Sequence, residues 1–126
     1  MRVILVAIAA MFTVATGLSS VALAGDAANG EKLFNDKAKG QCSVCHNTSG
    51  KKKVGPGLAG VSSRFSDGWL VKWLMDPQGV WEANDAETQK MKESVKKTKK
   101  KKTAMKLKNK LSQQQAEDIV AYMKGL

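Results

Sequence analysis

The residues of this chain best suited to chemistry are two cysteines and one histidine. The sequence contains only 2 Cys and 1 His, and all of them lie in the string Cys42-Ser43-Val44-Cys45-His46. C-x-x-C-H is the attachment signature of c-type haem. Two thiols at this spacing can each form a thioether with one vinyl group of a porphyrin, and the adjacent imidazole then lies beneath the iron. We therefore predict that Cys42 and Cys45 hold one covalent haem and that His46 binds its iron.

Three other uses of these residues are possible and less favoured. A redox-active dithiol of the thioredoxin kind usually follows a strand in an α/β pattern, and this sequence shows no such pattern. A structural zinc site takes four Cys or His ligands, whereas the chain offers three. A disulfide between Cys42 and Cys45 would close a tight loop and give His46 no role.

The sixth position of such an iron has no second histidine to fill it, which leaves a methionine sulfur, a lysine amine or an open position. Four methionines follow the haem motif: Met75, Met91, Met105 and Met123. Helix packing accounts for Met75 and Met123, and Met91 could pack on a helix face with Val95 one turn later. Met105 stands in a polar, non-periodic stretch where packing does not explain it. This placement favours Met105 as the ligand, with Met91 the main alternative.

Helical patterns account for the elements that must position these residues, and no strand pattern is present. We expect helices over residues 26–39, from Ser66 or Asp67 to Pro77, over residues 85 to about 97, and from Ser112 to Gly125. Residues 78–84 have no periodic pattern and are expected to be irregular. The last helix is the best defined, because Ser112 and Gln115 form a capping box. The predicted fold class is all-α.

The first 24 residues have the pattern of a signal peptide. Arg2 is followed by an almost wholly apolar stretch from Val3 to Val14, and the segment ends in Ala22-Leu23-Ala24, a small-x-small cleavage pattern. We predict cleavage after Ala24, export to the periplasm and a single domain over residues 25–126. An uncleaved membrane anchor is the alternative. After cleavage no second apolar stretch is long enough for stable insertion into a membrane.

The charge of the chain indicates an anionic partner. Its formal net charge is +10, and residues 90–110 contain 11 lysines with Glu93 as the only acid. This run predicts either a docking surface for an acidic redox protein or a solvated segment kept soluble by repulsion. Export argues against a nucleic-acid partner.

These motifs, taken in order, resemble class I cytochrome c over essentially all of residues 25–126. The resemblance rests on Gly30 and Phe34 in the first helix, Cys42 to His46, the turn Gly55-Pro56-Gly57-Leu58, and the last helix from Ala116 to Lys124 with Tyr122. It implies a fold in which the N- and C-terminal helices cross around a single covalent haem. It further implies that the Pro56 carbonyl accepts a hydrogen bond from His46 and that Met105, in the loop before the last helix, is the axial methionine.

The function that this resemblance implies is single-electron transfer between redox proteins, not enzymatic catalysis, because histidine and methionine together leave no open iron position. Eight apolar residues are expected to line the haem: Phe34, Leu58, Phe65, Leu70, Trp73, Leu74, Ile119 and Tyr122. Two alternatives remain open. The chain could be the haem subunit of a larger oxidoreductase, for example a sulfur-oxidising one. If no methionine binds, a five-coordinate haem could serve as a peroxidase or a gas-binding protein.

Overall fold

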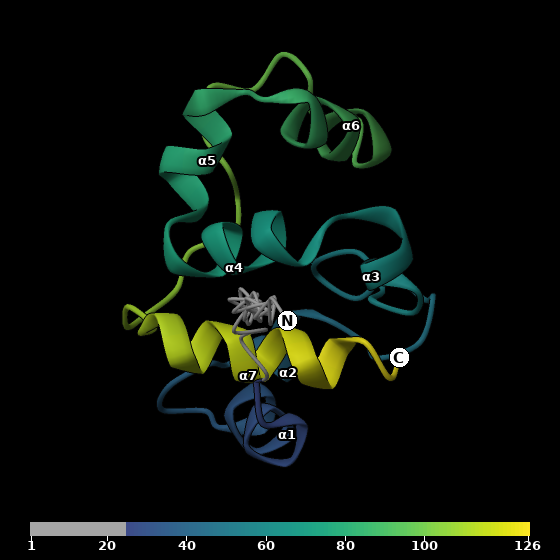
Figure 1. Ribbon diagram of the computed structural model, residues 1–126. Coiled ribbons are helices and arrows are strands. Elements are labelled where there is room, and N and C mark those ends of the chain that lie inside the picture. The colour runs from purple at the N-terminus through teal and green to yellow at the C-terminus, as the bar shows by residue number, and fades with distance from the viewer. Residues whose placement is uncertain (1–24) are drawn as a thin grey trace, which may run out of the picture.

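A computed structural model describes residues 25–126, and Figure 1 shows their arrangement. The helices are α1 (Ala27–Asn35), α2 (Cys42–Cys45), α3 (Val61–Arg64), α4 (Asp67–Met75), α5 (Pro77–Ala83), α6 (Ala86–Ser94) and α7 (Gln113–Met123). No strand occurs in this part of the chain. The all-α prediction is therefore confirmed. The predicted signal peptide, residues 1–24, lies outside the described residues.

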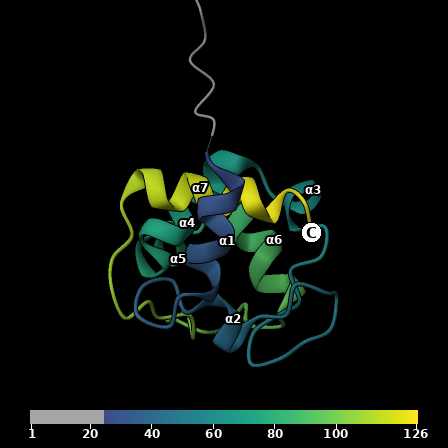
Figure 2. The same cartoon turned by 90° about the horizontal axis from the view of Figure 1, so that it is seen from below.

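The first and last long helices cross in direct contact, as Figures 1 and 2 show. Gly30 makes this crossing possible, because a Cβ atom there would lie only 1.9 Å from the Asp118 carbonyl oxygen of α7. Next to the crossing, the rings of Phe34 and Tyr122 pack with their centroids 5.4 Å apart. The predicted crossing of the N- and C-terminal helices is confirmed, and the backbone at residue 30 approaches α7 too closely for any side chain.

A buried carboxylate fastens the start of the domain to α7. The side chain of Asp118 accepts hydrogen bonds from the Asp26 backbone N–H at 2.8 Å, from Asn29 Nδ2 at 2.7 Å and from Gln114 Nε2 at 2.9 Å. These bonds, with that from Asn29 the largest contribution, lower the pKa of Asp118 from its ordinary value. The residue stays ionised at neutral pH and joins α1 to α7 by polar contacts as well as by packing.

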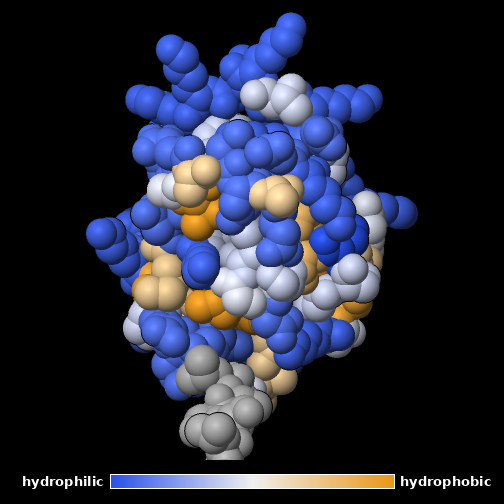
Figure 3. Space-filling view, turned by 45° about the horizontal axis from the view of Figure 1, so that its top comes forward, coloured by the Kyte–Doolittle hydropathy of each residue, from blue (hydrophilic) through white to orange (hydrophobic). Residues whose placement is uncertain are grey.

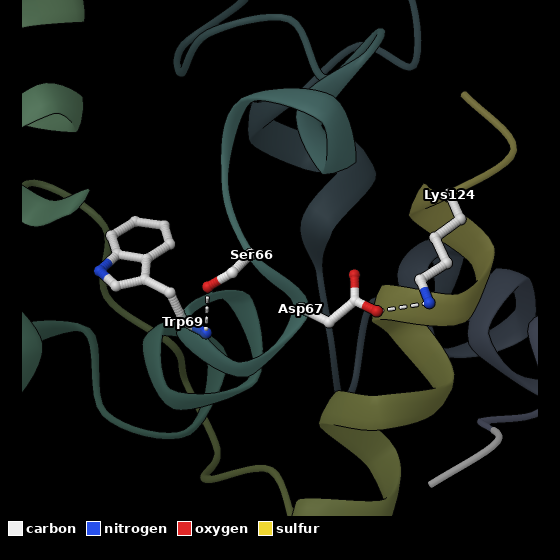
Figure 4. Close-up of polar contacts among 4 residues, drawn as sticks. All are labelled: Ser66, Asp67, Trp69 and Lys124. Carbon is white, nitrogen blue, oxygen red and sulfur yellow. Dashed lines mark hydrogen bonds and ion pairs between the residues drawn. The ribbon is translucent and has the colours of Figure 1, made fainter. Parts of the chain in front are cut away.

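The predicted start signals of α4 and α7 are both confirmed. Ser66 caps α4 by accepting a hydrogen bond from the Trp69 backbone N–H at 3.3 Å, and Asp67 forms an ion pair with Lys124 at the end of α7 (Figure 4). The capping box of α7 is complete, because Ser112 and Gln115 each bond the other's backbone N–H. The Asp67–Lys124 pair is half exposed and contributes little to stability.

The structure corrects the expectation that residues 78–84 are irregular. Residues 78–83 belong to α5, and Asn84 is its C-cap. Pro77 is the first residue of this helix, and Asp76 is the N-cap, accepting a hydrogen bond from Gly79 N–H at 2.9 Å. Proline is favoured at the first helical position because its missing N–H would have no partner there. Pro77 therefore ends α4 and begins α5. Two other helices are shorter than predicted, since α1 ends at Asn35 and α6 at Ser94.

One hydrophobic core joins α1, α4 and α7. Its buried members include Phe34, Phe65, Leu70, Leu74 and Ile119, and Leu58, Trp73 and Tyr122 pack against it. All eight residues expected to line the haem therefore lie in or against this core. Within the described residues, no helix is both long enough and apolar enough to cross a bilayer.

Candidate haem attachment site

The haem motif forms a single helical turn with the histidine directly after it. Gln41 enters the turn in the left-handed conformation (φ 54°), α2 spans Cys42–Cys45, and His46 leaves it in an extended conformation. The His46 backbone N–H donates to the Cys42 carbonyl oxygen at 2.8 Å, which closes the turn. Both thiols are free; Cys42 is buried and Cys45 is half-buried. Two thiols and one imidazole are thus held together on one short, hydrogen-bonded segment.

The environment of Cys42 opposes its use in a redox-active dithiol. Burial raises the pKa of the Cys42 thiol to about 11. Redox-active C-x-x-C pairs instead depend on a thiol whose pKa is lowered, so that the reactive thiolate is populated. No group of three His, Cys, Asp or Glu side chains among residues 25–126 is arranged to hold a metal ion.

The turn after the motif fixes the orientation of the imidazole. His46 Nδ1 lies 2.8 Å from the Pro56 carbonyl oxygen. A carbonyl oxygen can only accept, so Nδ1 carries the proton and Nε2 has its lone pair free for a metal. This is the contact that the family resemblance implies. A hydrogen bond of this kind also raises the basicity of a ligating histidine.

Gly55 allows the Pro56 turn to lie against the histidine ring. A Cβ atom at residue 55 would be 2.4 Å from His46 Cε1. The Gly55 N–H donates to the Cys45 carbonyl oxygen at 2.8 Å, and the Leu58 N–H donates to Asn47 O at 3.0 Å. The loop between the motif and α3 is therefore bonded back to the residues around His46 and covers one side of the imidazole.

The four methionines have different surroundings. Met123 is buried in α7, and Met75 is 37% exposed at the end of α4, so neither position contradicts the packing role expected from the sequence. Met91 and Met105 are both half-buried against the core. Met105 differs in its polar contacts: its sulfur accepts a hydrogen bond from Trp73 Nε1 at 3.0 Å, and its backbone N–H donates to Thr103 Oγ1 at 3.1 Å.

A row of aromatic rings runs from α3 to α5 beside Met105. Ring centroids are 4.8 Å apart for Phe65 and Trp69, 5.4 Å for Trp69 and Trp73, and 6.3 Å for Trp73 and Trp81. Each indole N–H has a partner, since Trp69 donates to Thr88 Oγ1 at 3.0 Å and Trp81 donates to the Lys100 carbonyl at 2.9 Å. Trp73 is among the apolar residues expected from the sequence, whereas Trp81 is not, because it lies in α5, which was not predicted.

Comparison with known proteins decides the family. The model of the family described as Cytochrome c matches residues 27–126. The chain belongs to the cytochrome c family. No curated protein and no solved structure matches it significantly. Membership implies one covalently bound haem c for a cytochrome of this size, a role as a haem-based electron carrier, and redox partners. The donor set of this cytochrome fits that group, since two free thiols on one turn adjoin an imidazole with an available Nε2.

Proposed function

We propose that this cytochrome is a periplasmic single-electron carrier with histidine–methionine ligation. Cys42 and Cys45 would hold the haem as thioethers, and His46 and Met105 would bind its iron. The observation that supports this most directly is the turn of α2, where both thiols lie beside an imidazole whose proton is held at Nδ1 by Pro56. When bound, the haem supplies an iron that alternates between its ferric and ferrous states.

The protein's own residues favour the reduced state. A thioether is a soft ligand that stabilises ferrous iron, which raises the reduction potential. The Trp73 N–H bonded to Met105 Sδ withdraws electron density from the sulfur and acts in the same direction. The apolar residues of the core disfavour the additional charge of ferric iron. With both His46 and Met105 as ligands, the iron would be closed to water and substrates.

Export completes the proposal. Cleavage after Ala24 would release residues 25–126, in which Gly25 and Asp26 lie against α7. A Cβ at Gly25 would be 2.2 Å from the Glu117 carbonyl oxygen, so Gly25 packs closely against α7. Thioether formation outside the cytoplasm would follow export, and the periplasm would be the compartment in which the protein meets its partners.

The experiment that tests this function is a denaturing gel stained for haem, combined with an absorption spectrum of the oxidised protein. We expect the stain to stay with the chain, the colour to resist extraction with acidified acetone, and a methionine-sulfur charge-transfer band in the oxidised spectrum. Rapid binding of carbon monoxide to the reduced protein would instead favour a five-coordinate haem. Stable co-purification with another subunit would favour a place in a larger oxidoreductase.

Two groups of lysines within the lysine-rich run differ in the structure. Lys90 and Lys92 bond to backbone carbonyls within the domain, whereas the lysines between residues 96 and 102 are exposed on a loop that we call the lysine turn. Trp81 Nε1 donates to Lys100 O at 2.9 Å, and Gln78 Oε1 accepts from Thr103 N at 3.2 Å. The lysine turn is thus fixed to α5, and Figure 3 shows long hydrophilic side chains projecting at the upper edge of the molecule.

We propose that the lysine turn docks an acidic redox partner. Replacing Lys99, Lys100, Lys101 and Lys102 with glutamine should slow electron exchange with ferricyanide, an anionic oxidant, by roughly tenfold at low ionic strength, because steering is lost. The potential should stay nearly constant, and the difference should fade as salt is added. Stopped-flow mixing measures the rates.

A matched control removes the same charge elsewhere. The control replaces four exposed lysines outside the run, which are Lys32, Lys37, Lys51 and Lys52. It should slow the reaction much less than the change in the lysine turn. Equal rates for both variants at low ionic strength would show that net charge alone steers the oxidant and that this turn is not a docking surface.

A further inference from the structure

One lysine of the basic run is buried. Lys92 is 8% exposed and is the only buried lysine among residues 25–126. Its ammonium donates to the Trp81 carbonyl oxygen at 2.8 Å and to Asn84 Oδ1 at 2.7 Å, and it lies 4.7 Å from the centroid of the Trp81 ring. An ammonium group has three donors and is costly to bury without partners. Two hydrogen bonds and the face of one aromatic ring therefore compensate the buried charge of the Lys92 ammonium.

The position of Lys92 connects two elements. Trp81 and Asn84 lie in the last turn and at the C-cap of α5, where carbonyl groups lack helical partners and a cation is favoured. The backbone of Lys92 makes a separate contact, in which its carbonyl oxygen accepts a hydrogen bond from the Lys97 N–H at 2.8 Å. One residue therefore holds the end of α5 with its side chain and the start of the lysine turn with its main chain.

The contacts continue from α5 to Met105. Trp81, beneath the Lys92 ammonium, tilts against Trp73 with their ring centroids 6.3 Å apart, and Trp73 donates its indole N–H to Met105 Sδ at 3.0 Å. Gln78, also in α5, accepts from Thr103 N–H, and Thr103 Oγ1 in turn accepts from Met105 N–H. Ring contacts and hydrogen bonds therefore link α5 to both the sulfur and the backbone of Met105.

We propose that Lys92 is a positioning residue for the axial methionine. By fixing the C-terminal end of α5, its ammonium keeps Trp81 against Trp73, and Trp73 in turn holds the sulfur of Met105, the residue that would bind the iron. This inference rests on the proposed ligation by Met105. This role distinguishes Lys92 from the exposed lysines of the lysine turn, whose side chains have no such contact with α5.

The test compares Lys92→Met with Lys97→Met, an exposed lysine of the same run, in the haem-loaded protein. Lys92→Met keeps an unbranched side chain, one atom shorter than that of lysine, and removes the charge and the donors. It should weaken the methionine-sulfur band of the oxidised protein and raise the apparent affinity for added imidazole roughly tenfold, in proportion to the larger population with Met105 detached. Lys97→Met should leave both unchanged, and Lys92→Arg, which retains charge and donors, should restore most of the band.

A second variant covers the case in which Lys92→Met does not fold. Asn84→Gly removes one acceptor and suits the left-handed conformation of residue 84 (φ 52°). Like Lys92→Met, it should weaken the methionine-sulfur band and raise the affinity for imidazole, but by a smaller amount. An unchanged band and affinity in the folded variants, with the band present in the unaltered protein, would overturn the role of Lys92 alone. Absence of the band from the unaltered protein would overturn ligation by Met105 and the role of Lys92 with it.

Discussion

Replacing both Cys42 and Cys45 with alanine should remove all haem stain from the denatured chain. The two thiols are the only cysteines in the sequence, so no other residue can form the thioethers that survive denaturation. The experiment requires expression in cells that mature c-type cytochromes, followed by a haem-stained denaturing gel. Each single variant should keep one thioether and therefore some stain, with a shifted absorption maximum of the reduced protein.

The matched control is Ser43→Ala. Ser43 lies between the two cysteines, and the hydrogen bond it makes to Lys53 Nζ, at 2.8 Å, uses its backbone carbonyl. This variant should stain like the unaltered protein. Haem that remains bound to the double variant after denaturation would contradict the attachment proposed for α2, and loss of stain in Ser43→Ala would show that the assay reports folding or maturation instead of the thioethers.

Replacing Met105 with alanine should lower the reduction potential and open the iron to added ligands. The soft sulfur is lost, and with it the stabilisation of ferrous iron. The decrease should be a substantial part of the roughly 0.8 V range that axial ligands span. Redox titration measures the potential. The oxidised protein should lose its methionine-sulfur band, and the reduced protein should bind carbon monoxide rapidly.

Met91→Ala is the control that separates the two candidate ligands. Both methionines are half-buried against the core, so each variant removes a similar packing contact. Met91→Ala should keep the band and change the potential little. If Met91→Ala loses the band while Met105→Ala retains it, the ligand is Met91, and the Trp73 hydrogen bond to Met105 has a packing role only. If both variants retain it, the sixth ligand is not one of these two methionines.

The sequence alone predicts those features that depend on residues close together in the chain. The spacing of Cys42, Cys45 and His46 predicts haem attachment, since one helical turn is enough to bring these groups together. The capping box at Ser112 predicts the start of α7 for the same reason, as its hydrogen bonds span only three positions. The wrong prediction at residues 78–84 also has a local cause, because Asp76 and Pro77 form the start signal of α5, whereas Pro77 alone predicts only the end of α4.

Contacts between distant residues were decided by the tertiary structure. Burial and hydrogen bonding distinguish Lys92 from the exposed lysines beside it, and the partners responsible lie in α5. In the same way, Trp73 reaches the Met105 sulfur across 32 positions of sequence, and Asn29 reaches the carboxylate of Asp118 across 89. Periodicity and composition describe a residue by its neighbours in the chain. Which charge is buried, and which sulfur accepts a hydrogen bond, depends on helices that come together only when the core forms.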